Sequence, residues 1–248
     1  MVAAAERIPY PRRRAMRRLL RFGTSLVLPA LANIEIIGRE NLPKAGPLVV
    51  VGNHFSFLDP VALILALPYP MEFLGGLTTP NAPAITNIFR QGWGVIHVRR
   101  GKGVSSREAL TNAQGTLEQG GVLAIFPEGG SWAAVLRPPR PGAALLAARS
   151  NAKILPIGLD GFVDVFKNFR LGKRHKTTIR IGKPFGPFKL GQGTGSYREQ
   201  LDEFGHQMMS HIAELIPPPL RGFYSDDPAI REAAKGTEVY PWDDQPEG

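Results

Sequence analysis

The sequence of 248 residues contains no cysteine, and this absence excludes several kinds of chemistry at once. Disulfide bridges, thiolate metal sites and a cysteine nucleophile all require a thiol. A long apolar run is also missing, because Gly23, Pro29 and Asn33 interrupt the stretch 22–34. A membrane-spanning helix needs about 20 apolar residues, and no small-residue cleavage pattern follows this stretch. We therefore expect neither a spanning helix nor a signal peptide.

Acidic side chains are scarce at the front of the chain, and basic ones are scarce at its end. Residues 1–21 hold seven arginines against one acid, whereas residues 226–248 hold seven acids against two bases. The net charge of +9 predicts an anionic partner such as nucleic acid, a membrane surface or an anionic substrate. Nucleic acid is not expected, because no aromatic side chains interleave with the arginines and no nucleic-acid motif follows them.

The arginine-rich front segment has the spacing of a helix with one apolar face. The apolar residues at helical intervals are Met16, Leu19, Leu20, Leu26 and Val27. Such a helix suits the plane of an anionic bilayer interface, where each basic residue contributes about 1 kcal/mol. The alternative is a surface helix that packs on the core and leaves its arginines in solvent. We predict that 1–34 is a basic amphipathic membrane-association segment on the cytoplasmic face of the cell membrane.

The rest of the chain alternates between short apolar strands and helical stretches, which predicts a single α/β domain over 35–216. The predicted strands are Pro47–Gly52, Met71–Leu74, Gly94–Val98, Val122–Phe126, Lys153–Leu159 and Thr177–Ile181. The predicted helices are one from the capping box at Ser105–Glu108 to Gly120, one over Gly142–Ser150, and a last long one from Tyr197 to Leu215. The proline-containing acidic tail, 217–248, is expected to be extended or disordered after Tyr224.

The stretch VVVGNHFSFLDP places His54 and Asp59 directly after an aliphatic run. Five residues correspond to about 500° on a straight helix, so the two side chains could not share one helix face. They could meet if a turn follows the strand and a helix begins at Asp59, with Asp59 as N-cap and Pro60 at the first helical position. Local residues leave open whether this is a catalytic pair or only a strand end before a capped helix.

Two further strands end in residues suited to binding. In FPEGGSW, the glycines after Glu128 let backbone N–H groups approach a ligand closely. In GWGVIHVRR, a strand carries Arg99 and Arg100 to its end, and guanidinium groups suit phosphate recognition. Each feature has a plain alternative, namely an ordinary turn or a basic strand end in water.

Taken in order, these features resemble the motifs of the glycerolipid acyltransferase family, whose best-known members are the 1-acylglycerol-3-phosphate acyltransferases. Asn53, His54 and Asp59 match its NHxxxxD motif, and the strand ending at Arg100 resembles its second block. Phe126–Gly129 matches the start of its third block, FPEGTRS, and Ile154–Ile157 resembles its fourth. The resemblance covers roughly residues 35–185. It implies a mixed, largely parallel β-sheet flanked by helices.

One departure concerns the third block, where the family has arginine and this chain has Ser131. The resemblance would assign that arginine to the phosphate of the acceptor. Arg100 remains, and Arg137 and Arg140 lie a short loop away. The acceptor could therefore also be a hydroxylated lipid with another headgroup.

The resemblance implies transfer of a fatty acyl group from acyl-CoA or an acyl carrier protein to the hydroxyl of a lysophospholipid such as 1-acylglycerol-3-phosphate. His54 would be the general base, as suits a residue type with a reference pKa of about 6.5, and Asp59 would orient it. Arg100, Glu128, Gly129 and Gly130 would bind the substrate. No enzyme nucleophile is needed, since the thioester is already activated, and neither a cofactor nor a metal is expected.

Three other classes of protein remain as alternatives. A serine hydrolase would use Ser56 or Ser131, although neither lies in a GxSxG elbow. A non-catalytic lipid-binding relative would explain the missing arginine. A metal enzyme would need ligands such as His206 and His211, which at five residues apart do not share a helix face.

Overall fold

The computed structural model describes residues 8–76, 86–98, 104–191 and 195–239. The strands are β1 (Ala32–Ile37), β2 (Leu48–Gly52), β3 (Glu72–Gly76), β4 (Val95–Val98), β5 (Val122–Ile125), β6 (Lys153–Asp160) and β7 (His175–Ile181). The α-helices are α1 (Arg14–Leu31), α2 (Asp59–Ala66), α3 (Thr86–Phe89), α4 (Val104–Glu118), α5 (Gly142–Ser150), α6 (Val165–Arg170), α7 (Tyr197–Ala213) and α8 (Pro228–Ala234). Shorter turns of helix are η1 (Arg39–Asn41), η2 (Arg90–Gly94), η3 (Phe162–Asp164), η4 (Pro218–Leu220) and η5 (Gly222–Tyr224).

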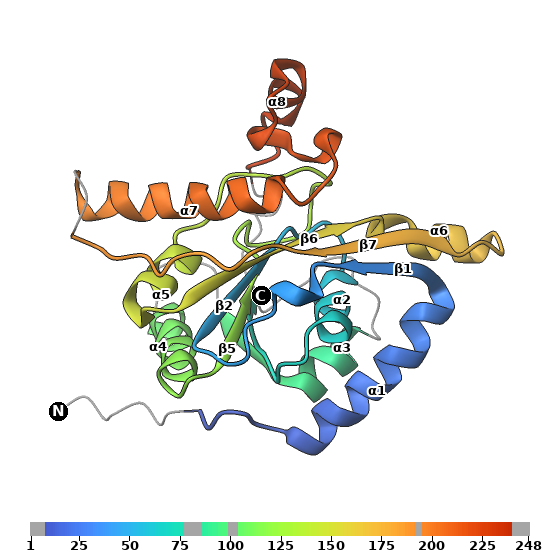
Figure 1. The fold of residues 1–248 in the computed structure, drawn as a ribbon, viewed down its shortest axis with the longest axis horizontal. Helices are drawn as coiled ribbons and strands as arrows, with labels where there is room; N and C mark the ends of the chain where they lie inside the picture. Colours follow the sequence, from blue (N-terminus) through green and yellow to red (C-terminus); the bar gives the residue numbers. More distant parts are fainter. Residues whose placement is uncertain (1–7, 77–85, 99–103, 192–194, 240–248) are drawn as a thin grey trace.

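The strands form one sheet in the order β1-β7-β6-β2-β5-β3-β4 (Figure 1). Every neighbouring pair is parallel except β6 and β7, which run antiparallel. The predicted mixed, largely parallel sheet is therefore confirmed. The central strand β2 has its partners β5 and β6 on either side, so the ends of these three strands lie next to one another.

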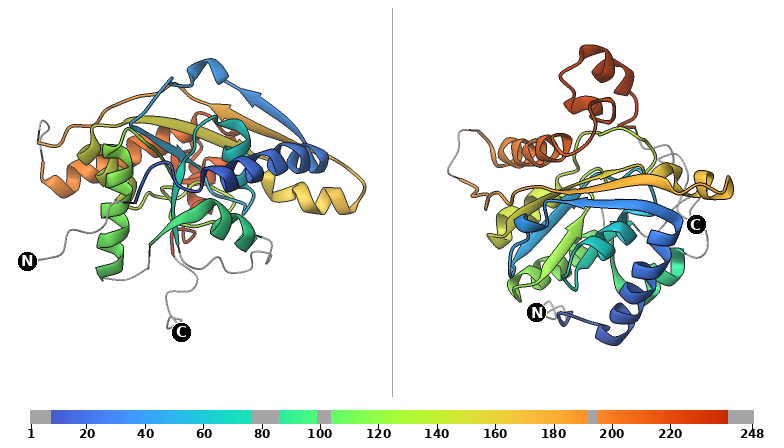
Figure 2. Two further views of the ribbon diagram at one scale, coloured as in Figure 1. Left: turned by 90° about the horizontal axis from the view of Figure 1, so that it is seen from below. Right: turned by 45° about the vertical axis from the view of Figure 1, so that its right-hand side comes forward.

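Helices cover both faces of this sheet (Figure 2). Side chains alternate across a strand, so Leu48 and Val50 of β2 pack into the core beneath α1, α2 and α6, while Val49 and Val51 pack beneath α4, α5 and α7. All four are fully buried. The continuous aliphatic run of β2 follows from this burial on both faces, as in other parallel sheets.

Helix α1 is docked on the core through a buried arginine, Arg17, as well as through apolar side chains such as Leu28. Arg17 is only 3% exposed, and its Nη2 lies 2.7 Å from Oε1 of the buried Glu72. Its other nitrogens donate to the carbonyl oxygens of Trp93 and Pro70, and Arg12 Nε lies 2.9 Å from Glu72 Oε2. The two alternatives drawn from the sequence both placed the arginines outside, and for Arg17 that expectation is wrong.

The opposite face of α1 carries exposed apolar side chains. Leu19 is 63% exposed, and Phe22, Leu26, Val27 and Met16 are exposed too. The helix therefore exposes apolar side chains to solvent, although Leu28 of the same helix is buried in the core. Along the described ranges, no helix combines the length and apolar character needed to cross a bilayer.

Two elements differ from the sequence-based expectations. Strand β1 crosses the predicted boundary between residues 34 and 35, and it pairs with β7 at the sheet edge. Its register with β7 joins the front segment to the sheet. The tail was expected to be extended or disordered, but Pro228–Ala234 forms α8. That expectation is wrong for this stretch, because Asp227 caps the helix by accepting a hydrogen bond from the N–H of Ala229 at 2.8 Å.

Candidate active site

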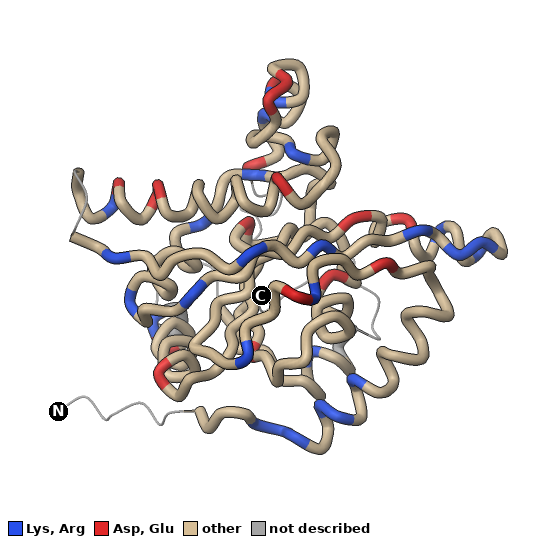
Figure 3. The backbone as a smooth tube through the Cα atoms, viewed as in Figure 1, with Lys and Arg blue, Asp and Glu red and all other residues tan. Residues whose placement is uncertain are grey.

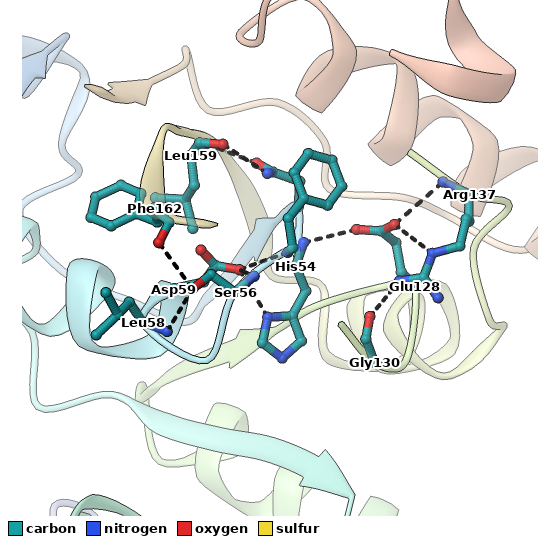
Figure 4. A network of polar contacts seen from close by, with 11 residues as sticks. His54, Ser56, Leu58, Asp59, Glu128, Gly130, Arg137, Leu159 and Phe162 are labelled. Carbon is teal, nitrogen blue, oxygen red and sulfur yellow. Dashed lines mark hydrogen bonds and ion pairs between the residues drawn. The ribbon is translucent and has the colours of Figure 1, made fainter. Parts of the chain in front are cut away.

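The residues of the first and third motifs meet where β2 and β5 end (Figure 4). His54 follows β2, and Glu128 follows β5, the strand paired with it. The N–H of His54 donates to Oε1 of Glu128 at 2.8 Å, which ties the two strand ends together. The carboxyl ends of strands in open α/β sheets are where such sites are built.

His54 and Asp59 form a hydrogen-bonded pair. His54 Nδ1 lies 3.0 Å from Asp59 Oδ2, and the same oxygen accepts the N–H groups of Phe55 and Ser56, each at 2.7 Å. A carboxylate that accepts at Nδ1 selects the tautomer with the proton on Nδ1. His54 Nε2 is then an acceptor, and Figure 4 shows it pointing away from Asp59. This arrangement is that of a histidine prepared to remove a proton.

The aspartate lies at the start of a helix and turns back to the histidine, as expected, but it does not cap that helix. Asp59 is the first residue of α2, and the N-cap is Leu58, so the predicted N-cap role of Asp59 is wrong. Its carboxylate turns back over residues 53–58 because the N–H groups of that turn point toward it. Pro60 follows in the first turn of α2, where a missing N–H costs nothing. The carboxylate therefore serves the histidine and its turn, not the helix.

Glu128 is a buried carboxylate held by a buried guanidinium. Its Oε2 accepts from Arg137 Nε at 3.1 Å and from the Arg137 N–H at 3.3 Å. Arg137 also donates to the carbonyl oxygen of Gly130 and lies over the ring of Trp132, 3.8 Å from its centroid. Burial raises the pKa of Glu128 to about 7, against the opposing pull of Arg137. Both carboxylate oxygens accept hydrogen bonds from the protein itself, so Glu128 positions the backbone of His54.

The raised pKa makes the stability of the protein depend on pH through Glu128. The unfolded chain releases this proton near pH 4.5 and the folded protein near pH 7, so the folded state binds more protons in between. The free energy of unfolding should therefore fall as the pH rises through this window. Glutamine at position 128 has no proton to release, so the variant Glu128→Gln should lack this part of the pH dependence. Urea unfolding from pH 4 to 8 measures the difference in slope, with the exposed Glu203→Gln as control. Parallel curves for Glu128→Gln and the wild type would contradict this.

The two glycines of the third motif are already engaged in a turn. The N–H of Gly129 donates to the carbonyl of Phe126 at 3.0 Å, and Gly129 has φ +79°, which a side chain would disfavour. A Cβ at Gly129 would lie 3.0 Å from Nε of Arg140, so that guanidinium packs directly over the turn. Arg140 is exposed, whereas Arg137 is buried. Of the two arginines considered as substitutes for the one missing at Ser131, Arg140 is thus the one accessible to a ligand.

The remaining candidates fall elsewhere. Arg100, like Arg99, lies outside the described residues, so its role as a substrate contact stays a prediction. Ser56 Oγ donates to the carbonyl of Phe162 at 3.2 Å and accepts the N–H of Leu58, so its proton is directed away from His54. His206 bonds to Tyr224 on the surface of α7, and nowhere in the described ranges do three or more metal-ligating side chains gather.

Two motif residues have roles in the site that the sequence did not predict. Asn53 exchanges a pair of hydrogen bonds with the backbone of Leu159, at 2.7 and 2.8 Å, and so extends the pairing of β2 with β6 beyond the strand end. Phe126 stacks on the His54 ring with centroids 4.2 Å apart. The signal was present, since each belongs to one of the sequence motifs. Its meaning depends on which strands are neighbours.

Comparisons with known proteins agree with one another. A sequence model described as Acyltransferase matches residues 33–160. A 1-acyl-sn-glycerol-3-phosphate acyltransferase of Borreliella burgdorferi is 32% identical over 132 residues, 52% of each chain. Another, of Chlamydomonas reinhardtii, is 29% identical over 198 residues, 76% of this chain and 54% of its own. The chain thus spans about half the length of these two relatives.

The crystal structure of the 1-acyl-sn-glycerophosphate acyltransferase PlsC from Thermotoga maritima is similar in fold, with a TM-score of 0.58 at 19% identity. The match covers 82% of this chain and 79% of that one.

Proposed function

Since this chain belongs to the acyltransferase family, we propose that it transfers a fatty acyl group from an acyl thioester to the free hydroxyl of 1-acylglycerol-3-phosphate. The observation that carries the proposal is the 3.0 Å contact between His54 Nδ1 and Asp59 Oδ2. It leaves Nε2 of His54 as a base at the end of β2. The relatives from Borreliella burgdorferi and Chlamydomonas reinhardtii, named for this acceptor, support the choice of substrate.

The proposed reaction is a direct transfer with general-base catalysis. His54 Nε2 removes the proton of the acceptor hydroxyl as its oxygen bonds to the thioester carbonyl carbon. The C–S bond then breaks, and the thiolate takes the proton from the imidazolium. Asp59 stabilises that imidazolium, and Glu128 holds the His54 backbone in place. A thioester is already activated, so the step requires no cysteine nucleophile. Whether the carrier is coenzyme A or an acyl carrier protein does not alter this chemistry.

Incubation with an acyl-CoA and 1-acylglycerol-3-phosphate tests the proposal. Release of free thiol together with a diacylated product of the expected mass is the supporting result. The same assay with acyl carrier protein and with other lysolipids ranks donors and acceptors. Tight lysolipid binding without thiol release from any donor would favour the non-catalytic alternative.

Arg140 is the residue we propose for the acceptor phosphate in place of the arginine absent at Ser131. Arg140→Gln is expected to raise the KM for the acceptor about tenfold, because a charge-assisted contact of this kind is worth about 1.5–3 kcal/mol. The KM for the donor should stay within twofold. Arg149→Gln, an exposed change on α5, is the control. An unchanged acceptor KM would remove Arg140 from the site.

The exposed apolar face of α1 supports placement at a membrane surface, as both substrates carry acyl chains. We propose peripheral association with the cytoplasmic face of the cell membrane. Replacing Leu19, Phe22 and Leu26 by serine should weaken binding to phospholipid vesicles by at least tenfold, since each burial contributes roughly 1.5–3 kcal/mol. These side chains already face outward, so the unfolding transition should not change. Co-flotation with vesicles measures the binding, and unaltered flotation would contradict the assignment.

A further inference from the structure

A second exposed apolar group lies where α6 turns into β7. Leu171 is 65% exposed, and Phe169 and Val163 are exposed as well. Exposed basic residues surround them, namely Lys167, Arg170, Lys173 and Arg174, with Asp164 as the acid in the same stretch. Figure 3 shows this concentration of positive charge at the tip formed by α6 and the start of β7. We call residues 163–174 the basic tip.

Hydrogen bonds hold the backbone of the basic tip, so the exposure of its apolar side chains is a feature of the folded structure. The carbonyl of Asn168 accepts the N–H groups of Leu171 and Lys173, and that of Phe169 accepts the N–H of Gly172. Gly172 has φ +69°, which closes the turn. Beneath it, Val165 and Phe162 are fully packed in the core. The tip is thus a rigid platform that carries apolar side chains outward.

The basic tip adjoins both the active site and α1. At one end, Ser56 Oγ donates to the carbonyl of Phe162, and the rings of Phe57 and Phe166 stack with centroids 5.5 Å apart. At the other end, Arg174 Nη2 donates to the carbonyl oxygens of Pro29 and Ala32, at the end of α1. Figures 1 and 2 both place α6 beside the last turns of α1. The tip therefore links the catalytic turn to the exposed apolar helix.

We infer that the basic tip is a second membrane contact, which takes the headgroup layer of an anionic phospholipid bilayer. Apolar side chains surrounded by lysine and arginine match a bilayer, which is anionic at its surface and apolar beneath, whereas a purely apolar partner would offer Lys167, Arg170 and Lys173 no negative charge. With α1, the tip gives the protein two attachment points, and these fix its orientation on the bilayer. The lipid substrates would then enter beside the turn that carries His54. This last step rests on the proposed function, but attachment of the tip does not.

Co-flotation with vesicles tests the charge contribution. The vesicles are phosphatidylcholine with about one quarter phosphatidylglycerol, compared with phosphatidylcholine alone. The triple variant Lys167→Gln, Arg170→Gln, Lys173→Gln should bind the anionic vesicles about 100-fold more weakly, at about fivefold per cation. The matched control is Arg149→Gln, Lys153→Gln, Lys189→Gln, three exposed cations at the opposite end of the sheet, which should bind within twofold of the wild type.

Fluorescent labelling tests the insertion of the tip. The chain has no cysteine, so Leu171→Cys and Lys153→Cys each accept a single environment-sensitive label. The label at 171 should shift to shorter wavelength and be quenched by brominated lipids, whereas the label at 153 should not. The inference is overturned if the triple variant floats with the anionic vesicles as the wild type does and brominated lipids do not quench the label at position 171. A dimer in solution that Phe169→Ser with Leu171→Ser dissociates would also overturn it, by showing that the tip binds a second copy.

These results are separable from those on the reaction. Thiol release measured with monodisperse substrates below their micellar concentration does not require a bilayer. Tip variants should keep wild-type turnover in that assay. Loss of lipid binding by the tip variants, with full turnover, supports the inference. Vesicle binding by a wild-type protein that shows no transferase activity would contradict the proposed function and leave the inference intact.

Discussion

Replacing His54 by alanine is expected to lower turnover by about 10²–10⁴-fold while leaving the fold intact. The expected loss is the usual contribution of a general base, and without it the acceptor hydroxyl keeps its proton as it attacks the thioester. His54 is partly exposed at the end of β2, with its side chain 14% accessible, so its removal opens no large cavity. Thiol release at saturating substrate measures the effect, because the base acts on the rate of the chemical step more than on binding.

The companion variant is Asp59→Asn, which keeps the His54 imidazole as a base and removes the carboxylate that orients it. An amide at this position cannot stabilise the imidazolium, so turnover should fall by a factor comparable to that of His54→Ala, and the double variant should be little worse than either single one. The control is His206→Ala, at the exposed surface of α7, which should turn over at the wild-type rate. Wild-type turnover of His54→Ala would exclude the general-base assignment. Additive losses in the double variant would show that the two residues act separately.

Replacing Glu72 by glutamine is expected to lower the free energy of unfolding by about 3 kcal/mol or more. The change removes the counter-charge of Arg17 and Arg12 and leaves the buried Arg17 guanidinium without a carboxylate. Losing one partner of a buried ion pair costs about 3–5 kcal/mol for this reason. Since Glu72 lies in β3 and both arginines lie at or near α1, the docking of that helix should loosen first. Urea unfolding measures the total loss, and amide hydrogen exchange along α1 measures its location.

The control for this prediction is an exposed ion pair of the same chemical kind. Lys176 Nζ lies 3.3 Å from Glu35 Oε2, with both side chains at least half exposed. Exposed pairs of this type contribute about 0–1 kcal/mol, so Glu35→Gln should change the free energy of unfolding by less than 1 kcal/mol. Equal effects of Glu35→Gln and Glu72→Gln would show that burial of the Glu72 pair contributes nothing.

The elements that were predicted well carry their signals within a few residues. Helix α5 begins at Gly142 and ends at Ser150 as expected, and α7 begins at Tyr197, where Ser196 and Glu199 form a capping box. The six predicted strands all exist, with ends that differ by at most two residues. Strand β1 was missed because its six residues, ANIEII, follow directly on a helix without a turn signal, and only pairing with β7 makes them a strand.

The orientation of α1 shows where sequence reasoning fails. Its periodicity predicted one apolar and one basic face, but arginines and leucines lie on both the buried and the exposed side. Which face turns inward depends on Glu72 and on the carbonyl oxygens of Pro70 and Trp93, more than 50 residues away. A rule that buries apolar faces cannot anticipate a buried carboxylate that offers arginine a better partner.

By itself, the sequence determined the class of fold, the order of the motifs and the identity of the proposed catalytic pair, His54 and Asp59. The class of fold follows from periodicity and residue type, which act over short distances, whereas the catalytic pair follows from the resemblance of the motifs to those of the acyltransferase family. Only the tertiary structure decided that Leu58 rather than Asp59 is the N-cap of α2, that Glu128 and Arg137 support the site from a buried position, and that α1 buries Arg17 while Leu19 and Phe22 stay exposed. Each of these depends on groups from different strands and helices meeting in space, and their partners are fixed by strand order, which no local pattern encodes.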